Sequence, residues 1–257
     1  MISVLDFVRF SLGFIRLGTF MAVVPLFNMR NVPMMVKLGF AALCSLVALP
    51  PLEASWNIES WGVLALLAFH EVIIGLALAF VVILVFSIVN FAGHYVDTPI
   101  GFGMASVFDP AIGGQVPVFS QFYYIMAVLI FLGVDAHVWL IQAVQYSFKA
   151  IPFGTLIQLE PAFWLVMDLI KQVFVIGIQI ALPITATILL TDIGLGIVIR
   201  AVPQINVFVL GFPIKILVGL IVVYVGLPTF VYIASQLFAV DGLLFGYVQG
   251  MLALGGS

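Results

Sequence analysis

Four long stretches of the chain contain neither charged residues nor histidine, and they constrain the fold more than any other feature. They are residues 72–93, 110–134, 172–191 and 216–240. Each is long enough to cross about 30 Å of hydrocarbon as an α-helix. Only 7% of the 257 residues are charged, whereas a soluble domain has roughly a quarter. These features predict an all-α membrane protein and argue against a water-soluble domain.

Two further segments are apolar enough to be hydrophobic helices. Residues 7–27 contain Arg9 and Arg16, and residues 36–52 end in Pro50-Pro51. Counting these two segments, we expect about six hydrophobic helices. The formal net charge is −3 and no run of basic residues occurs, so the sequence gives no sign of nucleic-acid binding.

Three charged residues lie within or beside these apolar segments and are candidates for functional intramembrane charges: Arg16, Glu71 and Asp192. A lipid-facing arginine near mid-bilayer costs about 2.5 to 3.5 kcal/mol. Arg9 shares a helix face with Arg16 and can extend to the interface. Arg16 lies deeper, so we expect a partner from another helix or chain. Glu71 and Asp192 fit the same argument with less force, because each could lie near an interface.

The sequence shows no arrangement of residues typical of catalysis or metal binding. His70 stands beside Glu71, but the next helical turn offers no second histidine. His94 and His137 stand alone, and no Ser-His-Asp or paired-carboxylate pattern occurs. We therefore expect no catalytic residue, no metal site and no cofactor, and we predict that the protein is not an enzyme.

The segment YVDTPIGFGMASVFDPAIGGQVPVFSQF, residues 95–122, is the most unusual part of the chain. Its prolines and glycines predict an interrupted helix, while its many apolar side chains make exposure to water unfavourable. Irregular backbone at membrane depth is tolerated inside protein or beside a water-filled cavity. Two interpretations stay open at this point: an apolar constriction in a pore, and a re-entrant loop that serves packing alone.

A second unusual stretch carries a resemblance to a known family. LLTDIGLGIVIRAVPQINVFVLGFPIKILVGLIVVYVGLP, residues 189–228, resembles the carboxyl-terminal signature of the FliR/SctT export-gate family of type III secretion. Its PQIN…GFPIK core is long and mixed in composition, and it looks flagellar. The resemblance extends over the full chain, and IGFGMASVFDPAIGG resembles the family's plug region with its Asp-Pro step.

The resemblance implies a non-enzymatic export-gate subunit in the bacterial cytoplasmic (inner) membrane, at the flagellar basal body. Members of the family complete a ring of FliP and FliQ subunits through which unfolded flagellar proteins are exported. FlhB and FlhA belong to the same apparatus. The family also implies kinked helices in hairpins, with residues from about 1 to 167 similar to FliP and from about 168 to 257 similar to FliQ.

The resemblance further implies that one loop helps to plug the closed pore. Phe108, Ile112 and Val116 would supply apolar contact, Gly113 and Gly114 freedom to move, and Asp109-Pro110 a fixed anchor. The complete predicted plug loop comprises Phe108, Asp109, Pro110, Ala111, Ile112, Gly113, Gly114, Gln115, Val116 and Pro117.

The stretch AVPQINVFVLGFPIKI, residues 201–216, is predicted to form a hairpin turn used in assembly. A buried turn needs side chains that satisfy its backbone groups, together with prolines and glycine that set the bend. An ordinary cytoplasmic loop between two spans is the alternative; it explains the basic residues but not the amides. The residues assigned to this turn are Arg200, Pro203, Gln204, Asn206, Gly211, Pro213 and Lys215.

Two other functions compete with the export gate. A small-solute transporter or channel would usually show matched broken helices in its two halves, and the sequence shows one break, near Asp109. An intramembrane enzyme would need converging His, Asp or Glu residues, which the sequence does not offer. The export gate is therefore the leading prediction, with the transporter as the alternative.

Overall fold

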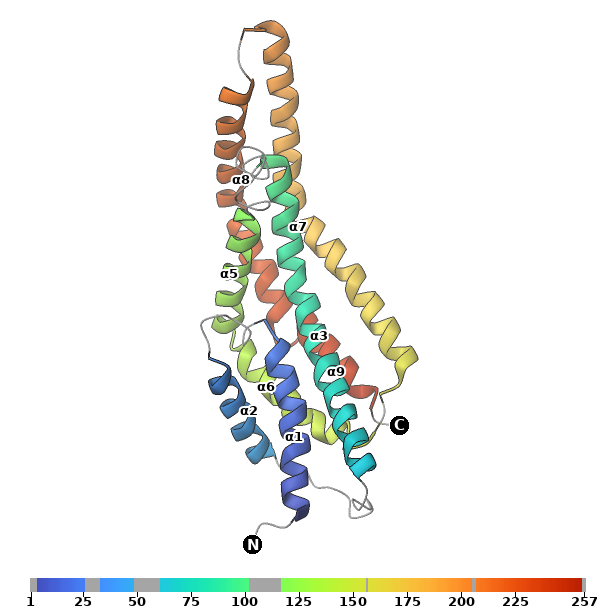
Figure 1. Cartoon of the computed structure of the whole chain (residues 1–257). Coiled ribbons are helices and arrows are strands. Elements are labelled where there is room, and N and C mark those ends of the chain that lie inside the picture. Colours follow the sequence, from blue (N-terminus) through green and yellow to red (C-terminus); the bar gives the residue numbers. More distant parts are fainter. Residues whose placement is uncertain are drawn as a thin grey trace. The chain divides into compact units, whose positions relative to one another are not determined.

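The computed structural model describes residues 4–25, 33–48, 61–101, 117–155, 157–204 and 207–255, and the regular structure in these ranges is helical. The predicted all-α fold is therefore confirmed for the described residues. Figure 1 shows the helices in chain order: α1 (Val4–Val23), α2 (Met34–Ala48), α3 (Trp61–Ile100), α5 (Val118–Gly133), α6 (Ala136–Ala150), α7 (Leu159–Ala201), α8 (Val207–Phe238) and α9 (Leu243–Ala253).

Each of the six predicted hydrophobic segments overlaps a helix, but fewer helices are long and apolar enough to cross a membrane. Among the described residues, α3, α7 and the stretch Val209–Ala253 qualify, and the bent pair of α5 and α6 brings the number to at most four. Helix α1 fails because it contains Asp6, Arg9 and Arg16. Helix α2 fails because it has only 15 residues.

Described helices cover both ends of the segment 95–122, which was predicted to be irregular. Helix α3 continues through Pro99 to Ile100, and α5 already begins at Val118. Pro99 therefore lies within α3 and not in an interruption of the helix. Pro99 lies in the last turn, where its ring removes one backbone hydrogen bond with little helix left to continue. Gly101 then ends α3 with a φ of 95°, a left-handed conformation that glycine adopts without steric cost.

The predicted turn at residues 201–216 is also shorter than expected. Helix α7 ends at Ala201, two residues before Pro203, because a proline restricts the residue preceding it to extended conformations. Helix α8 begins at Val207, so Gly211, Pro213 and Lys215 lie within its first turns rather than in the connection. Here too a proline near a helix end removes only one backbone hydrogen bond.

The described helices belong to two compact units, each built from segments far apart in sequence. The first unit combines Met1–Val85, Val134–Ile170 and Leu237–Ser257. The second unit combines Phe86–Gly133 and Lys171–Gln236. The division near residue 168 into FliP-like and FliQ-like parts stays a prediction.

In the first unit, α1 packs beside α2, and α6 contacts both α2 and α9 (Figure 1). Helix α1 buries one face, with a three- to four-residue spacing typical of an amphipathic helix. Small residues bring the helices close together: a methyl group added at Gly13 would lie 2.8 Å from Ser45 Oγ of α2. The buried residues of α1 are Leu12, Gly13, Arg16, Leu17, Phe20 and Met21.

In the second unit, α5 packs against the carboxyl-terminal part of α3 and against α8. The rings of Phe86 in α3 and Phe131 in α5 lie 5.5 Å apart. Tyr123 in α5 stacks on Phe230 in α8, with ring centroids 4.4 Å apart and both side chains buried. Such aromatic pairs add directional preference to apolar contact, so they help to fix how α5 is rotated about its axis.

Candidate functional site

The first unit contains a buried ion pair between two of the predicted intramembrane charges. Arg16 in α1 and Glu71 in α3 are both completely buried, and Arg16 Nε lies 2.5 Å from Glu71 Oε2. The sequence indicated that Arg16 needs a partner from elsewhere, and in the structure that partner is Glu71. Burying two charges is unfavourable unless pairing and further hydrogen bonds compensate.

Arg16 also binds the end of α6. Its Nη1 donates to the Ser147 carbonyl oxygen at 2.9 Å and to Ser147 Oγ at 3.1 Å. Its Nη2 donates to the Ile151 carbonyl oxygen at 3.0 Å. A cation is favourable there because the last carbonyl groups of a helix carry partial negative charge. Arg16 therefore joins α1, α3 and the carboxyl end of α6.

Aromatic rings complete the surroundings of the Arg16 guanidinium. Its central carbon lies 4.5 Å from the centre of the Phe148 ring and 5.7 Å from that of Phe153. A desolvated guanidinium over an aromatic face gains about 2 kcal/mol or more. These rings also exclude water, which strengthens the ion pair with Glu71.

Close contact between α1 and α3 explains how Glu71 reaches Arg16. A methyl group added at Gly75 would lie 2.1 Å from Thr19 Oγ1 and 2.6 Å from the Arg16 carbonyl oxygen. Because Gly75 lies four residues after Glu71, both face the same side of α3. The small residue thus permits the backbone approach that brings the carboxylate to the guanidinium.

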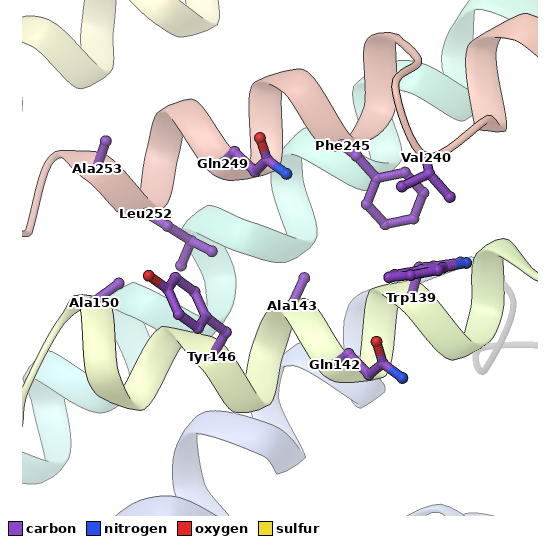
Figure 2. A pocket seen from close by; sticks show the side chains of 10 residues that line it. All are labelled: Trp139, Gln142, Ala143, Tyr146, Ala150, Val240, Phe245, Gln249, Leu252 and Ala253. Atoms are coloured by element: carbon purple, nitrogen blue, oxygen red, sulfur yellow. The ribbon is translucent and has the colours of Figure 1, made fainter.

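An apolar groove lies between α6 and α9 of the same unit. Figure 2 shows Trp139 and Phe245 facing each other from the two helices, with Tyr146 and Leu252 farther along. The groove has a volume of about 670 Å³ and no charged lining residue, so its chemistry suits an apolar group. Its lining residues are Trp139, Gln142, Ala143, Tyr146, Ala150, Val240, Phe245, Gln249, Leu252 and Ala253.

In the second unit, an ion pair joins the two helices of the predicted hairpin. Lys215 Nζ in α8 lies 2.5 Å from Asp192 Oδ1 in α7. The side chains are 24% and 43% exposed, so solvent screens this pair far more than the buried one. The pair borders a cavity of about 400 Å³ that also contacts the end of α3 through Thr98, Pro99 and Gly101.

Most of the predicted plug loop lies outside the described residues, which resume at Pro117, an exposed residue just before α5. Arg200, Pro203 and Gln204 are exposed at the end of α7, and Asn206 lies outside the described residues. The structure therefore brings together Arg16 with Glu71 and Asp192 with Lys215. The plug assignment stays a prediction.

The three histidines lie apart from any metal-binding arrangement in the described parts of the chain. No group of three His, Cys, Asp or Glu side chains in those parts is placed to hold a metal ion. His70 Nδ1 and His137 Nδ1 are buried, and neither has a hydrogen-bond partner among the described residues. These residues form no recognisable catalytic arrangement.

Sequence reasoning missed the part of the Arg16 site that comes from α6. Two of its acceptors are backbone carbonyl groups, of Ser147 and Ile151, and every residue has such a group. One available signal was Ser147, a small polar residue next to Phe148. The other was the Phe148 and Phe153 pair that surrounds the guanidinium.

Comparison with known proteins places the chain in a family. The sequence pattern of the bacterial export proteins, family 1, matches residues 7–240. The flagellar biosynthetic protein FliR of Bacillus subtilis is 35% identical, covering 99% of this chain and 98% of its own length. FliR of Pectobacterium carotovorum is 31% identical, covering 90% and 88%, and that of Escherichia coli is 30% identical, covering 88% and 86%. The chain therefore belongs to family 1 of the bacterial export proteins, the family that includes these FliR proteins.

Proposed function

We propose that this protein is a non-enzymatic subunit of the flagellar type III export gate in the bacterial inner membrane. In this role it completes a pore with FliP and FliQ, through which unfolded flagellar proteins are exported, and it works beside FlhB and FlhA. Its family membership and its relatives named as flagellar biosynthetic proteins support this proposal.

The observation that carries the proposal is the length of apolar surface on α8. Its large exposed apolar side chains run from Val209 to Tyr232, a stretch of about 36 Å. At an ordinary tilt of about 20° this stretch would extend about 34 Å along the membrane normal, against about 30 Å of hydrocarbon. The stretch also includes Lys215, whose side chain is 24% exposed and is costly to place in lipid. We therefore infer that neighbouring protein subunits, and not lipid alone, cover this surface.

Co-purification tests the assembly. The tagged chain, produced together with FliP and FliQ and extracted in a mild detergent, should retain both proteins in one complex of defined mass. Retention follows if α8 is covered by protein. Purification of the chain as a stable monomer, free of FliP and FliQ, would contradict the proposal and favour the small-solute transporter.

A loop replacement tests the proposed plug. Deletion of Ala111–Val116 should let ions leak through the assembled gate, because apolar bulk that excludes water is removed. Replacing the same six positions with glycine and serine keeps the length and should also cause leakage. Unchanged membrane conductance in both variants, with normal amounts of assembled gate, would refute the plug role while leaving the assembly role intact.

A further inference from the structure

Asp97, near the end of α3, holds the beginning of α5 through its side chain. Its Oδ1 accepts the Phe119 N–H at 2.8 Å, and its Oδ2 accepts the Ser120 N–H at 3.1 Å. The carboxylate is buried, with 4% of the residue exposed. The first N–H groups of a helix have no partner within their own helix and carry partial positive charge. Asp97 therefore caps the first turn of α5 from α3.

Asp97 also contributes to the end of its own helix. Its backbone carbonyl oxygen accepts the N–H of Gly101 at 3.3 Å, which is the contact that closes a helix ending in a left-handed glycine. The side chain of Phe212 in α8 lies against Gly101, since an added methyl group there would be 2.5 Å from Phe212 Cε1. Asp97 thus contacts both Gly101, which follows the end of α3, and the first turn of α5.

Close backbone contact supports this arrangement. A methyl group added at Gly93 would lie 2.2 Å from Ser120 Cα and 2.6 Å from Ser120 N. Ser120 Oγ donates to the Asn90 carbonyl oxygen at 3.3 Å. The glycine lets α5 approach until the Asp97 carboxylate can reach two of its N–H groups. Phe119, Ser120 and Asp97 are all buried, so water cannot easily replace these hydrogen bonds.

We infer that Asp97 is a positioning residue. It fixes the end of α3, where the chain leaves that helix, relative to the beginning of α5. Two charge-assisted hydrogen bonds to adjacent N–H groups are directional and stronger than neutral ones. The aromatic contacts of α5 help to orient it, but hydrogen bonds, which require defined distances and angles, specify its position along α3 more strictly. The consequence for the gate rests on the function proposed above, because the segment between these two fixed points contains the proposed plug.

Amide hydrogen exchange of the intact gate tests the contact directly. In Asp97→Ala, exchange at Phe119 and Ser120 should accelerate about tenfold or more, because each charge-assisted hydrogen bond is worth at least about that factor. The amide of Ala127, deeper in α5, should keep its rate. Asp97→Asn should lie in between, since its amide oxygen still accepts one N–H group while its NH₂ group accepts none.

A second pair of variants leaves the carboxylate in place. Gly93→Ala should accelerate the same two amides, because the added methyl group displaces Ser120 from Asp97. Gly133→Ala at the end of α5 is the matched control: its added methyl group would meet no atom within 4 Å, so exchange at positions 119 and 120 should not change.

Ion leakage through the assembled gate provides the functional readout. Asp97→Ala and Gly93→Ala should leak, and Asp97→Asn should leak less. Unchanged exchange at Phe119 and Ser120 in Asp97→Ala would overturn the inference. The inference would also be overturned if Asp97→Ala accelerates exchange at these amides but causes no ion leakage, while the deletion of Ala111–Val116 does cause leakage. If that deletion causes no leak, the proposed plug fails, and the exchange rates alone decide whether Asp97 fixes the two helix ends.

Discussion

Replacing Arg16 with methionine should destabilise the protein more than replacing Glu71 with glutamine. Methionine roughly keeps the length of the side chain but removes its charge and every donor. Arg16 donates to Glu71, to both oxygens of Ser147 and to the Ile151 carbonyl oxygen. Its loss removes the donor to a buried carboxylate and to three other acceptors, of which the Ser147 carbonyl oxygen still accepts the Ile151 N–H. Removing one member of a buried ion pair costs about 3 to 5 kcal/mol.

Replacing Glu71 with glutamine should cost less. The amide oxygen can still accept a hydrogen bond from Arg16 Nε, and Arg16 keeps its contacts with α6 and with the rings of Phe148 and Phe153. The loss is then about one charged hydrogen bond, or about 1.5 to 3 kcal/mol. The combined Arg16→Met and Glu71→Met variant removes both charges, so it should be more stable than Arg16→Met alone.

Thermal unfolding of the detergent-purified protein distinguishes these outcomes. For a chain of this size, each kcal/mol shifts the midpoint by about 2 to 4 °C, so Arg16→Met should lower it by about 6 to 20 °C. Glu71→Gln should lower it by less, and the double variant should recover part of the loss. The reasoning fails if Glu71→Gln is as damaging as Arg16→Met, or if the two methionine replacements act additively.

Two further variants test other contacts by the same measurement. Gly75→Ala should lower the free energy of unfolding by about 1 to 3 kcal/mol, because the added methyl group would overlap a backbone oxygen of α1. Gly18→Ala is the control: its methyl group meets open space, so it should be neutral or slightly stabilising. Equal losses of stability in the two variants would contradict the close-contact argument. Lys215→Ala should cost less than about 1 kcal/mol because its ion pair with Asp192 is partly exposed, and a midpoint shift above about 5 °C would show that this pair matters more than its exposure indicates.

Composition and periodicity were sufficient to predict the all-α membrane class. The uncharged runs predicted α3, α7 and α8 because sustained apolar sequence of that length has few other stable structures in lipid. The ends of these helices were less predictable. Pro99 was part of a segment predicted to be irregular and Pro213 was assigned to a turn, but both lie within helices. A proline near a helix end costs one hydrogen bond, and burial elsewhere along the helix outweighs that cost.

The buried charges were identifiable from the sequence, but their partners were not. Arg16 and Glu71 were conspicuous because ionisable residues are costly in an apolar setting. Their pairing joins positions 55 apart in the sequence, and no periodicity encodes such a distance. Asp97 could not be singled out within the segment 95–122, because its role depends on N–H groups that every non-proline residue has.

The buried polar residues show how so apolar a chain specifies its helix neighbours. Apolar contact is non-directional, and in lipid it gives little preference for one helix partner over another. The described chain buries seven polar or charged residues: Arg16, Ser45, Glu71, Asp97, Ser120, Ser147 and Thr185. Five of them belong to the networks around Arg16 and Asp97. Each network has one carboxylate on α3, and each aims it at groups of another helix in the same unit. Because hydrogen bonds require defined distances and angles, these two carboxylates select α1 and α5 as neighbours of α3 and fix their registers, which the surrounding leucine, valine and phenylalanine contacts alone cannot do.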